Sequence, residues 1–192
     1  MKKGERTRQQ MLDTAMGLFQ RQGYHATGLN QVLKESEAPR GSLYFHFPGG
    51  KQQLAAEAVE VAGRRMCELI EELLRRAEDP EQAAALLVDA FSAVLEGSDF
   101  QSGCPIATVA LEATADSSEV RSACGGAYGS WLEVLESRFV DWGVPGDEAG
   151  DLAAVALSMV EGALLLARVQ RDVSVLRAVG RRLAALLESA RR

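Results

Sequence analysis

The stretch TGLNQVLKESEAPRGSLYFHFPGGK, residues 27–51, decides how the N-terminal part of this chain folds. Thr27 stands where a helix N-cap would stand, ahead of an apolar pattern that predicts a short helix ending near Ser36. Pro39 is favourable in the first turn of a following helix, because the N–H that proline lacks has no partner there. The run Pro48-Gly49-Gly50 ends that second helix. The spacing therefore predicts a helix-turn-helix.

The sequence on both sides of this stretch predicts further helices. Upstream, the apolar residues within 7–22 share one helix face, and Gly23 follows as a stop. Downstream, the helical period resumes at Lys51 and lasts to about Arg76. Turn residues separate more helices, which we expect near 81–96, 105–115, 118–141, 148–169 and 173–190. With no strand alternation and no repeat, the fold class is all-α with about nine helices.

The distribution of charge divides the chain into two parts. The net charge is −6, but residues 1–51 hold eight Lys/Arg against four Asp/Glu, and all four lysines lie there. The remaining residues carry −10. A basic head on an acidic body indicates that only the head meets a polyanion. We therefore expect a helix-turn-helix DNA-binding domain over 1–50 and a helical body over 51–192, with the helix from about 51 to 76 linking them.

The chemistry of the predicted second helix suits DNA. In a helix-turn-helix this element lies in the major groove while the first helix crosses the backbone. Arg40 can reach a guanine edge or a phosphate, and the small Gly41 and Ser42 allow close approach. Hydroxyl, imidazole and ammonium groups supply phosphate donors. The predicted DNA-binding residues are Thr27, Arg40, Gly41, Ser42, Tyr44, His46 and Lys51.

Each of these residues also has a purely structural interpretation. Thr27 can be only a helix cap, and His46 a structural hydrogen-bonding group. Tyr44 or Phe45, but not both, is expected to pack inward. The remaining apolar side chains of the stretch are expected to form the core of the head, namely Leu29, Val32, Leu33, Leu43 and Phe47.

The same residues carry a resemblance to a known family. The stretch 27–51 resembles the DNA-binding signature of TetR-family regulators. Pro48–Leu54 and Gly103–Ala107 look like the LmrA/YxaF-like branch of that family. One departure is Ser36-Glu37-Ala38, which replaces a more usual Ala-Gly pair in the turn. The resemblance maps the seven predicted DNA-binding residues onto family contact positions, with Arg40 reading bases. It also implies a small-molecule effector bound in the body, a homodimer and repression.

Pockets for such effectors are mostly apolar with a few polar anchors. Candidate pocket residues are Met66, Leu69, Phe91, Phe100, Cys104, Thr108, Trp131 and Leu135. For any one of them, plain core packing explains the residue equally well. Glu112 is a further candidate anchor. Cys104 can be a thiol sensor only if it is exposed with a lowered pKa.

The last two predicted helices carry long apolar faces with small residues. Such a pair either completes the core of one subunit or pairs with its copy across a twofold axis, and the resemblance favours the dimer. The candidate interface residues are Leu152, Val155, Met159, Gly162, Ala163, Val175, Val179, Leu183 and Leu186.

Other classes of protein fit the sequence less well. The run Gly49-Gly50-Lys51 lacks the first glycine and the final Ser/Thr of a phosphate-binding loop. Both histidines, His25 and His46, lie in the head, so the body has none for base catalysis. We expect no enzyme, metal or cofactor. A helical adaptor protein without DNA function is the alternative, but it leaves the basic head unexplained. No apolar run approaches a membrane span and no signal peptide is evident, which favours the cytoplasm.

Overall fold

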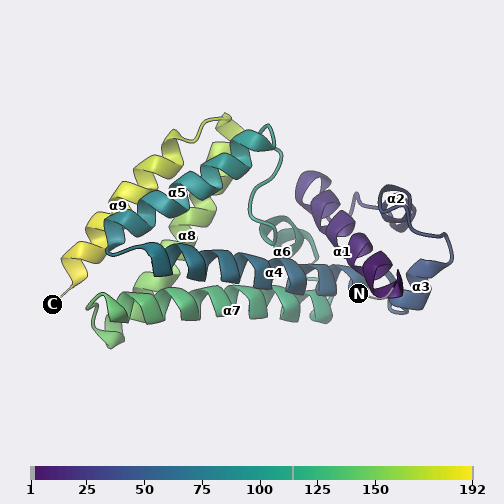
Figure 1. The fold of residues 1–192 in the computed structure, drawn as a ribbon, viewed down its shortest axis with the longest axis horizontal. Coiled ribbons are helices and arrows are strands. Elements are labelled where there is room, and N and C mark those ends of the chain that lie inside the picture. The colour runs from purple at the N-terminus through teal and green to yellow at the C-terminus, as the bar shows by residue number, and fades with distance from the viewer. Residues whose placement is uncertain (1–2, 114, 192) are drawn as a thin grey trace. The chain divides into compact units, whose positions relative to one another are not determined.

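The computed structural model describes residues 3–113 and 115–191. Within these residues the chain forms nine helices and no strand (Figure 1). This confirms the all-α class and the expected number of helices. The helices are α1 Lys3–Gln22, α2 Leu29–Glu35, α3 Ser42–His46, α4 Gly50–Arg76, α5 Pro80–Gly97, α6 Ala107–Ala113, α7 Ser118–Asp141, α8 Gly146–Gln170 and α9 Ser174–Ala190.

The helices pack into two compact units. The first contains the chain up to Arg65 together with Cys104–Ala127, and the second contains Met66–Gly103 together with Tyr128–Arg192. Helices α4 and α7 therefore contribute residues to both units. By packing, α6 belongs with the head rather than with the rest of the body. This grouping differs from a division at residue 50, which was drawn from charge and motif.

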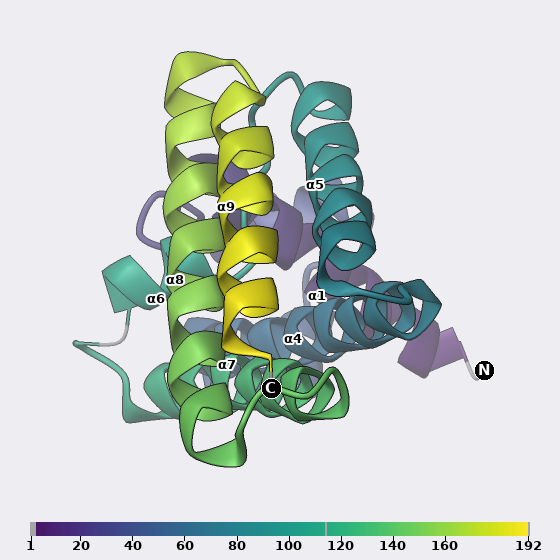
Figure 2. The same ribbon diagram turned by 90° about the vertical axis from the view of Figure 1, so that its left-hand side faces the viewer.

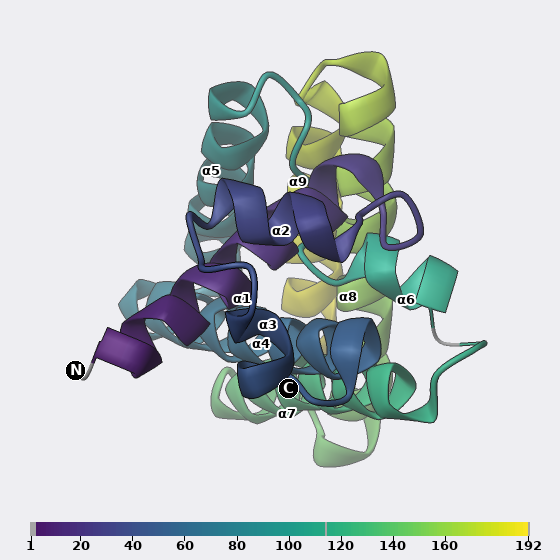
Figure 3. The ribbon, with the colours of Figure 1, turned by 90° about the vertical axis from the view of Figure 1, so that its right-hand side faces the viewer.

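The first unit is built on the apolar face of α1. The side chains predicted to share that face are all buried, namely Met11, Leu12, Ala15, Leu18 and Phe19. Figure 3 shows α1 together with the two short helices α2 and α3. Gly23 ends α1 at a φ of 90°, and its N–H donates to the Phe19 carbonyl at 3.0 Å. A left-handed residue after a helix is a common stop, as the sequence predicted here.

The turn after α2 is a Schellman motif. Ala38 N–H donates to the Leu33 carbonyl at 3.0 Å, and Glu37 N–H donates to the Lys34 carbonyl at 3.3 Å. Glu37 takes the left-handed position with a φ of 53°. The residue that replaces the family's usual glycine thus adopts the conformation that a glycine would adopt.

Helix α3 begins later than the sequence suggested. Pro39 lies before the helix rather than in its first turn, and Gly41 is the N-cap. Ser42 braces this turn, because its hydroxyl donates to the Pro39 carbonyl at 2.6 Å. After α3, Gly50 turns the chain with a φ of 66° and α4 starts at once. Gln53 accepts a hydrogen bond from Gly49 N–H at 2.8 Å and so caps the start of α4.

The second unit is a helical bundle in which α5, α8 and α9 lie side by side (Figure 2). Helix α5 starts with an N-cap, Asp79, which accepts from Gln82 N–H at 2.8 Å, followed by a proline at N1. Helix α9 approaches α5 closely at Gly180, where an added Cβ would lie 2.6 Å from Val88 Cγ2. Trp131 of α7 is among the most completely buried side chains in this unit.

Helix α8 is long and apolar enough to cross a membrane by length and composition, alone among the described residues. Glu161 and Arg168 interrupt it, so no uninterrupted apolar run approaches the roughly 20 residues of a membrane span, as expected. The criterion is weak for a single helix, because core helices of water-soluble proteins also meet it. Here α8 contacts α9 and buries six side chains within its own unit.

Candidate DNA-binding surface

Helix α3 presents two distinct faces. A helix turns by about 100° per residue, so Leu43 and Phe47 fall on one side, and both are buried. Gly41, Tyr44 and Phe45 fall on the other side, and all three are exposed. We call Arg40, Gly41, Tyr44 and Phe45 the outer face of α3. Leu43 and Phe47 anchor the helix, as predicted, and leave the outer face for a partner.

Both aromatic side chains of the outer face are exposed. Tyr44 is 66% exposed and Phe45 is 81% exposed. The expectation that one of the two packs inward was wrong. The five-residue helix α3 has one inward-facing side, and Leu43 and Phe47 occupy it. Tyr44 and Phe45 therefore both face outward. Sequence reasoning consequently missed Phe45 as a surface residue.

Arg40 lies in the turn immediately before α3 and is exposed. Among the described residues its guanidinium has no hydrogen-bond or ion-pair partner. It therefore remains available for a base edge or a phosphate, in keeping with the role predicted for it.

Gly41 is not required by the fold of the chain. Its backbone is ordinary, with a φ of −85°, and an added Cβ would meet no atom within 4 Å. A glycine that needs neither a left-handed conformation nor close packing leaves open space on the outer face. That space permits a ligand to approach the backbone closely.

Thr27 does not belong to this surface. Its side chain is 1% exposed, and its hydroxyl donates to the Gly23 carbonyl at 2.7 Å. The N-cap of α2 is Gly28, which has no side chain to cap the helix. Both roles predicted for the Thr27 side chain, helix cap and phosphate donor, therefore disagree with the structure. The hydroxyl instead closes the turn between α1 and α2.

Ser42 and His46 lie at the edges of the outer face. The Ser42 hydroxyl is engaged in bracing the turn before α3. The His46 ring is half-buried and meets the Phe45 ring edge-on, with centroids 5.0 Å apart. His46 therefore packs against Phe45. The phosphate contact predicted for His46 stays a prediction.

Lys51 at the start of α4 is already engaged within the protein. Its ammonium lies 4.4 Å from the centroid of the Tyr24 ring and donates to the His25 carbonyl at 3.3 Å. Partial burial lowers the pKa of Lys51, and the Glu112 carboxylate opposes that shift. A phosphate contact would have to compete with these interactions.

Helix α6 is bound to the same turn through Glu112. The Glu112 carboxylate accepts from His25 N–H at 2.9 Å, and the His25 ring lies 3.0 Å from the Glu112 carbonyl oxygen. An added Cβ at Gly23 would fall 2.3 Å from a Glu112 carboxylate oxygen. Glu112 thus fixes the α1–α2 turn instead of facing a ligand pocket. No local sequence signal could reveal this, since 87 residues separate the partners.

Comparison with known proteins agrees with this geometry. Residues 11–58 match the family model described as bacterial regulatory proteins, tetR family. Residues 80–182 match the model described as transcriptional regulator LmrA/YxaF-like, C-terminal domain. The chain belongs to the TetR family of transcriptional regulators.

Individual relatives of this regulator cover almost its whole length. It is 40% identical to the uncharacterised HTH-type transcriptional regulator Rv0196 of Mycobacterium tuberculosis, over 94% of this chain and 93% of that protein. It is 36% identical to the HTH-type transcriptional regulator LmrA of Bacillus subtilis, over 86% and 88% of the two chains. A solved TetR-family regulator from Cytophaga hutchinsonii shares the fold with a TM-score of 0.83 at 21% identity, covering 100% and 98%. All three are named as transcriptional regulators.

The residues predicted to line an effector pocket do not all lie in one of the two units of this TetR-family regulator. Cys104 and Thr108 belong to the first unit and the other six candidates to the second. Trp131 and Leu135 are buried, whereas Leu69 is exposed. The Cys104 sulfur is buried and accepts from Ile106 N–H at 3.4 Å, which does not match the exposed environment of a thiol sensor.

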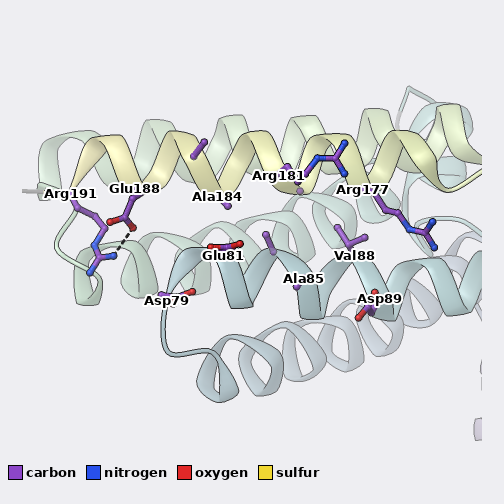
Figure 4. A pocket seen from close by; sticks show the side chains of 13 residues that line it. Asp79, Glu81, Ala85, Val88, Asp89, Arg177, Arg181, Ala184, Glu188 and Arg191 are labelled. Carbon is purple, nitrogen blue, oxygen red and sulfur yellow. Dashed lines mark hydrogen bonds and ion pairs between the residues drawn. The ribbon is translucent and has the colours of Figure 1, made fainter.

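A groove of about 810 Å³ lies between α5 and α9 (Figure 4). Its lining combines alanines, Val88 and Gly180 with charged residues such as Asp89, Arg177 and Arg181. None of the eight predicted pocket residues lines it. Effector pockets are concave and mostly apolar, so this charged groove is a poor match to the predicted ligand.

The regulator exposes an apolar stripe along α8. Val155, Leu165, Leu166 and Val169 are exposed, and Gly162 lies between them with nothing near its missing side chain. Val155 and Gly162 were predicted for the dimer interface. Ala163 and Leu183, also predicted there, are instead buried within the subunit. The other predicted interface residues are half-buried or exposed, namely Leu152, Met159, Val175, Val179 and Leu186.

Proposed function

We propose that this protein is a homodimeric repressor whose α3 helices read two half-sites of an operator and whose body releases DNA when a small, largely apolar molecule binds. The outer face of α3 carries the proposal. Arg40, Gly41, Tyr44 and Phe45 are all exposed, and none of them has a role in the core of the head. A rigid, anchored helix with such a face suits the major groove.

The DNA contacts divide by chemistry. Arg40 reads a base edge, Tyr44 donates its hydroxyl to a phosphate, and Gly41 lets the backbone approach the DNA. Ser42, His46 and Lys51 lie beside these residues and take part secondarily. The reading function resides in residues 1–50, and residues 51–192 supply dimerisation and effector binding.

The exposed stripe on α8 supplies the dimer. Two copies of the same stripe, related by a twofold axis, bury apolar side chains that a single subunit leaves in water. A short helix such as α3 contacts few bases. A dimer overcomes this limit, because its two α3 helices bind two half-sites together. Half-sites one turn of DNA apart require the two helices to be separated by about 34–36 Å, and a longer operator requires a wider separation.

Release by an effector requires a difference in affinity between two states. An effector shifts the regulator only if it binds the DNA-incompatible state more tightly than the DNA-binding state. We propose that this state differs in the tilt of α4, which runs from the head into the second unit. The protein acts where the chromosome is, in the cytoplasm.

The test uses purified protein and DNA from upstream of its own gene. Wild-type protein is expected to bind one sequence in that DNA, with an affinity that falls steeply as salt rises. Arg40→Ala is expected to cost about 1–3 kcal/mol of binding free energy and to relax specificity at one position.

Gly41→Ala sharpens the test, because it separates DNA binding from folding. Alanine fits the backbone of Gly41 and meets no atom, so we expect equal or slightly higher stability, by up to about 1 kcal/mol. Operator affinity is expected to fall by about tenfold, since the added methyl group occupies the space left for DNA. The matched control is Gly97→Ala, also in open space but at the end of α5. Equal, salt-independent binding to all sequences would rule out the repressor.

A further inference from the structure

We propose that Phe45 is a specificity residue that contacts the C5-methyl group of a thymine in the operator. The inference rests on the proposed function, because it requires α3 to lie in the major groove. It adds a base preference that neither Arg40 nor Tyr44 supplies.

The Phe45 ring is an apolar group exposed to solvent. It is 81% exposed on the outer face of a helix that Leu43 and Phe47 anchor from the opposite side. The His46 ring meets it edge-on, with the two ring centroids 5.0 Å apart. Phe45 is thus an exposed apolar group on a surface whose other side chains are polar. A side chain with this placement contributes nothing to the core of the head.

The chemistry of the ring limits what it can recognise on DNA. A phenyl group has no donor for a phosphate oxygen, unlike the Tyr44 hydroxyl next to it. Among the groups that base pairs display in the major groove, the thymine methyl is the apolar one. Gly41 lies one turn before Phe45 on the same side of the helix and has no side chain. No side chain at that position would therefore prevent the Phe45 ring from reaching the base edges.

The experiment uses a duplex that purified wild-type protein selects from a random-sequence library. Each thymine of the half-site is replaced in turn by deoxyuridine, which lacks only the C5-methyl group. Wild-type protein is expected to lose about fourfold in affinity at one thymine per half-site, the equivalent of one buried methylene-sized group. Phe45→Ala is expected to bind the parent duplex more weakly and to show no further loss at that position, so the two changes are not additive.

Two controls separate this contact from other roles of α3. Tyr44→Phe removes the neighbouring hydroxyl and keeps a ring, so it is expected to weaken binding while retaining the deoxyuridine effect. Circular dichroism of Phe45→Ala is expected to match wild type, because an exposed ring is being removed. The inference is overturned if no thymine is sensitive, or if Phe45→Ala keeps the sensitivity. Failure to select any sequence would instead overturn the repressor itself.

Discussion

Glu37 holds a left-handed backbone conformation that costs an L-residue about 1–2 kcal/mol. The two hydrogen bonds of the Schellman motif after α2 hold it there. The carboxylate is exposed, and the side chain is not needed for the turn. The residue therefore stores a small amount of backbone strain at the junction between the two helices of the motif.

Replacing Glu37 by glycine is expected to stabilise the protein by about 1 kcal/mol, because glycine adopts this conformation without the steric cost. Urea unfolding followed by circular dichroism measures the change. The control is Glu35→Gly in the last turn of α2, where the same substitution is expected to destabilise by a similar amount. Equal effects of the two changes would show that Glu37 is not strained.

Single side chains near this turn also mark where sequence reasoning fell short. Thr27 has the right residue type and position for a helix cap, yet its hydroxyl bonds back to Gly23, and the choice depends on how the 23–26 turn closes. Tyr44 and Phe45 were treated as alternatives for the core, although a five-residue helix has room for neither. Arg40 and Gly41 were placed correctly on the surface, because a motif fixes their position relative to the buried residues.

At the scale of elements, helices with clear borders were predicted from local signals. Helix α7 matches its predicted range of 118–141, and α4 and α9 differ by one residue at one end. Apolar periodicity together with proline and glycine breaks suffices for this, since both act within a few residues. The binding of α6 to the α1–α2 turn was not predictable, because it depends on a contact between distant segments.

Glu112→Ala tests the contact that binds α6 to the turn. Its removal deprives His25 N–H of its acceptor, and because the site is exposed we expect a loss of only about 0.5–1.5 kcal/mol. The specific signature is faster hydrogen exchange of the His25 amide by NMR. Leu111→Ala, one residue away on α6 and 85% exposed, is expected to leave that amide unchanged. Equal exchange in the two variants would contradict the role of Glu112.

For the whole molecule, the stripe on α8 explains why a helix with the composition of a membrane span belongs to a DNA-binding protein. The exposed positions along it, Val155, Ser158, Gly162, Leu165 and Val169, recur at three- and four-residue intervals. That spacing places them on one face, opposite the side that packs within the subunit. A one-sided stripe suits a second helix rather than surrounding lipid, which would contact all sides.

Leu165→Glu combined with Val169→Glu is therefore expected to produce a monomer. The two side chains are 61% and 72% exposed, so the subunit keeps its fold, while facing carboxylates in a twofold interface repel each other and lose their water. Sedimentation velocity is expected to show a dimer for wild type and a monomer for the variant at the same micromolar concentration. Leu111→Glu is the control, likewise an exposed apolar residue but located on α6, and is expected to remain dimeric. Operator affinity should fall in the monomer alone, since one α3 helix then binds without its partner. A monomeric wild type would contradict the dimer, and a variant that stays dimeric would place the interface elsewhere.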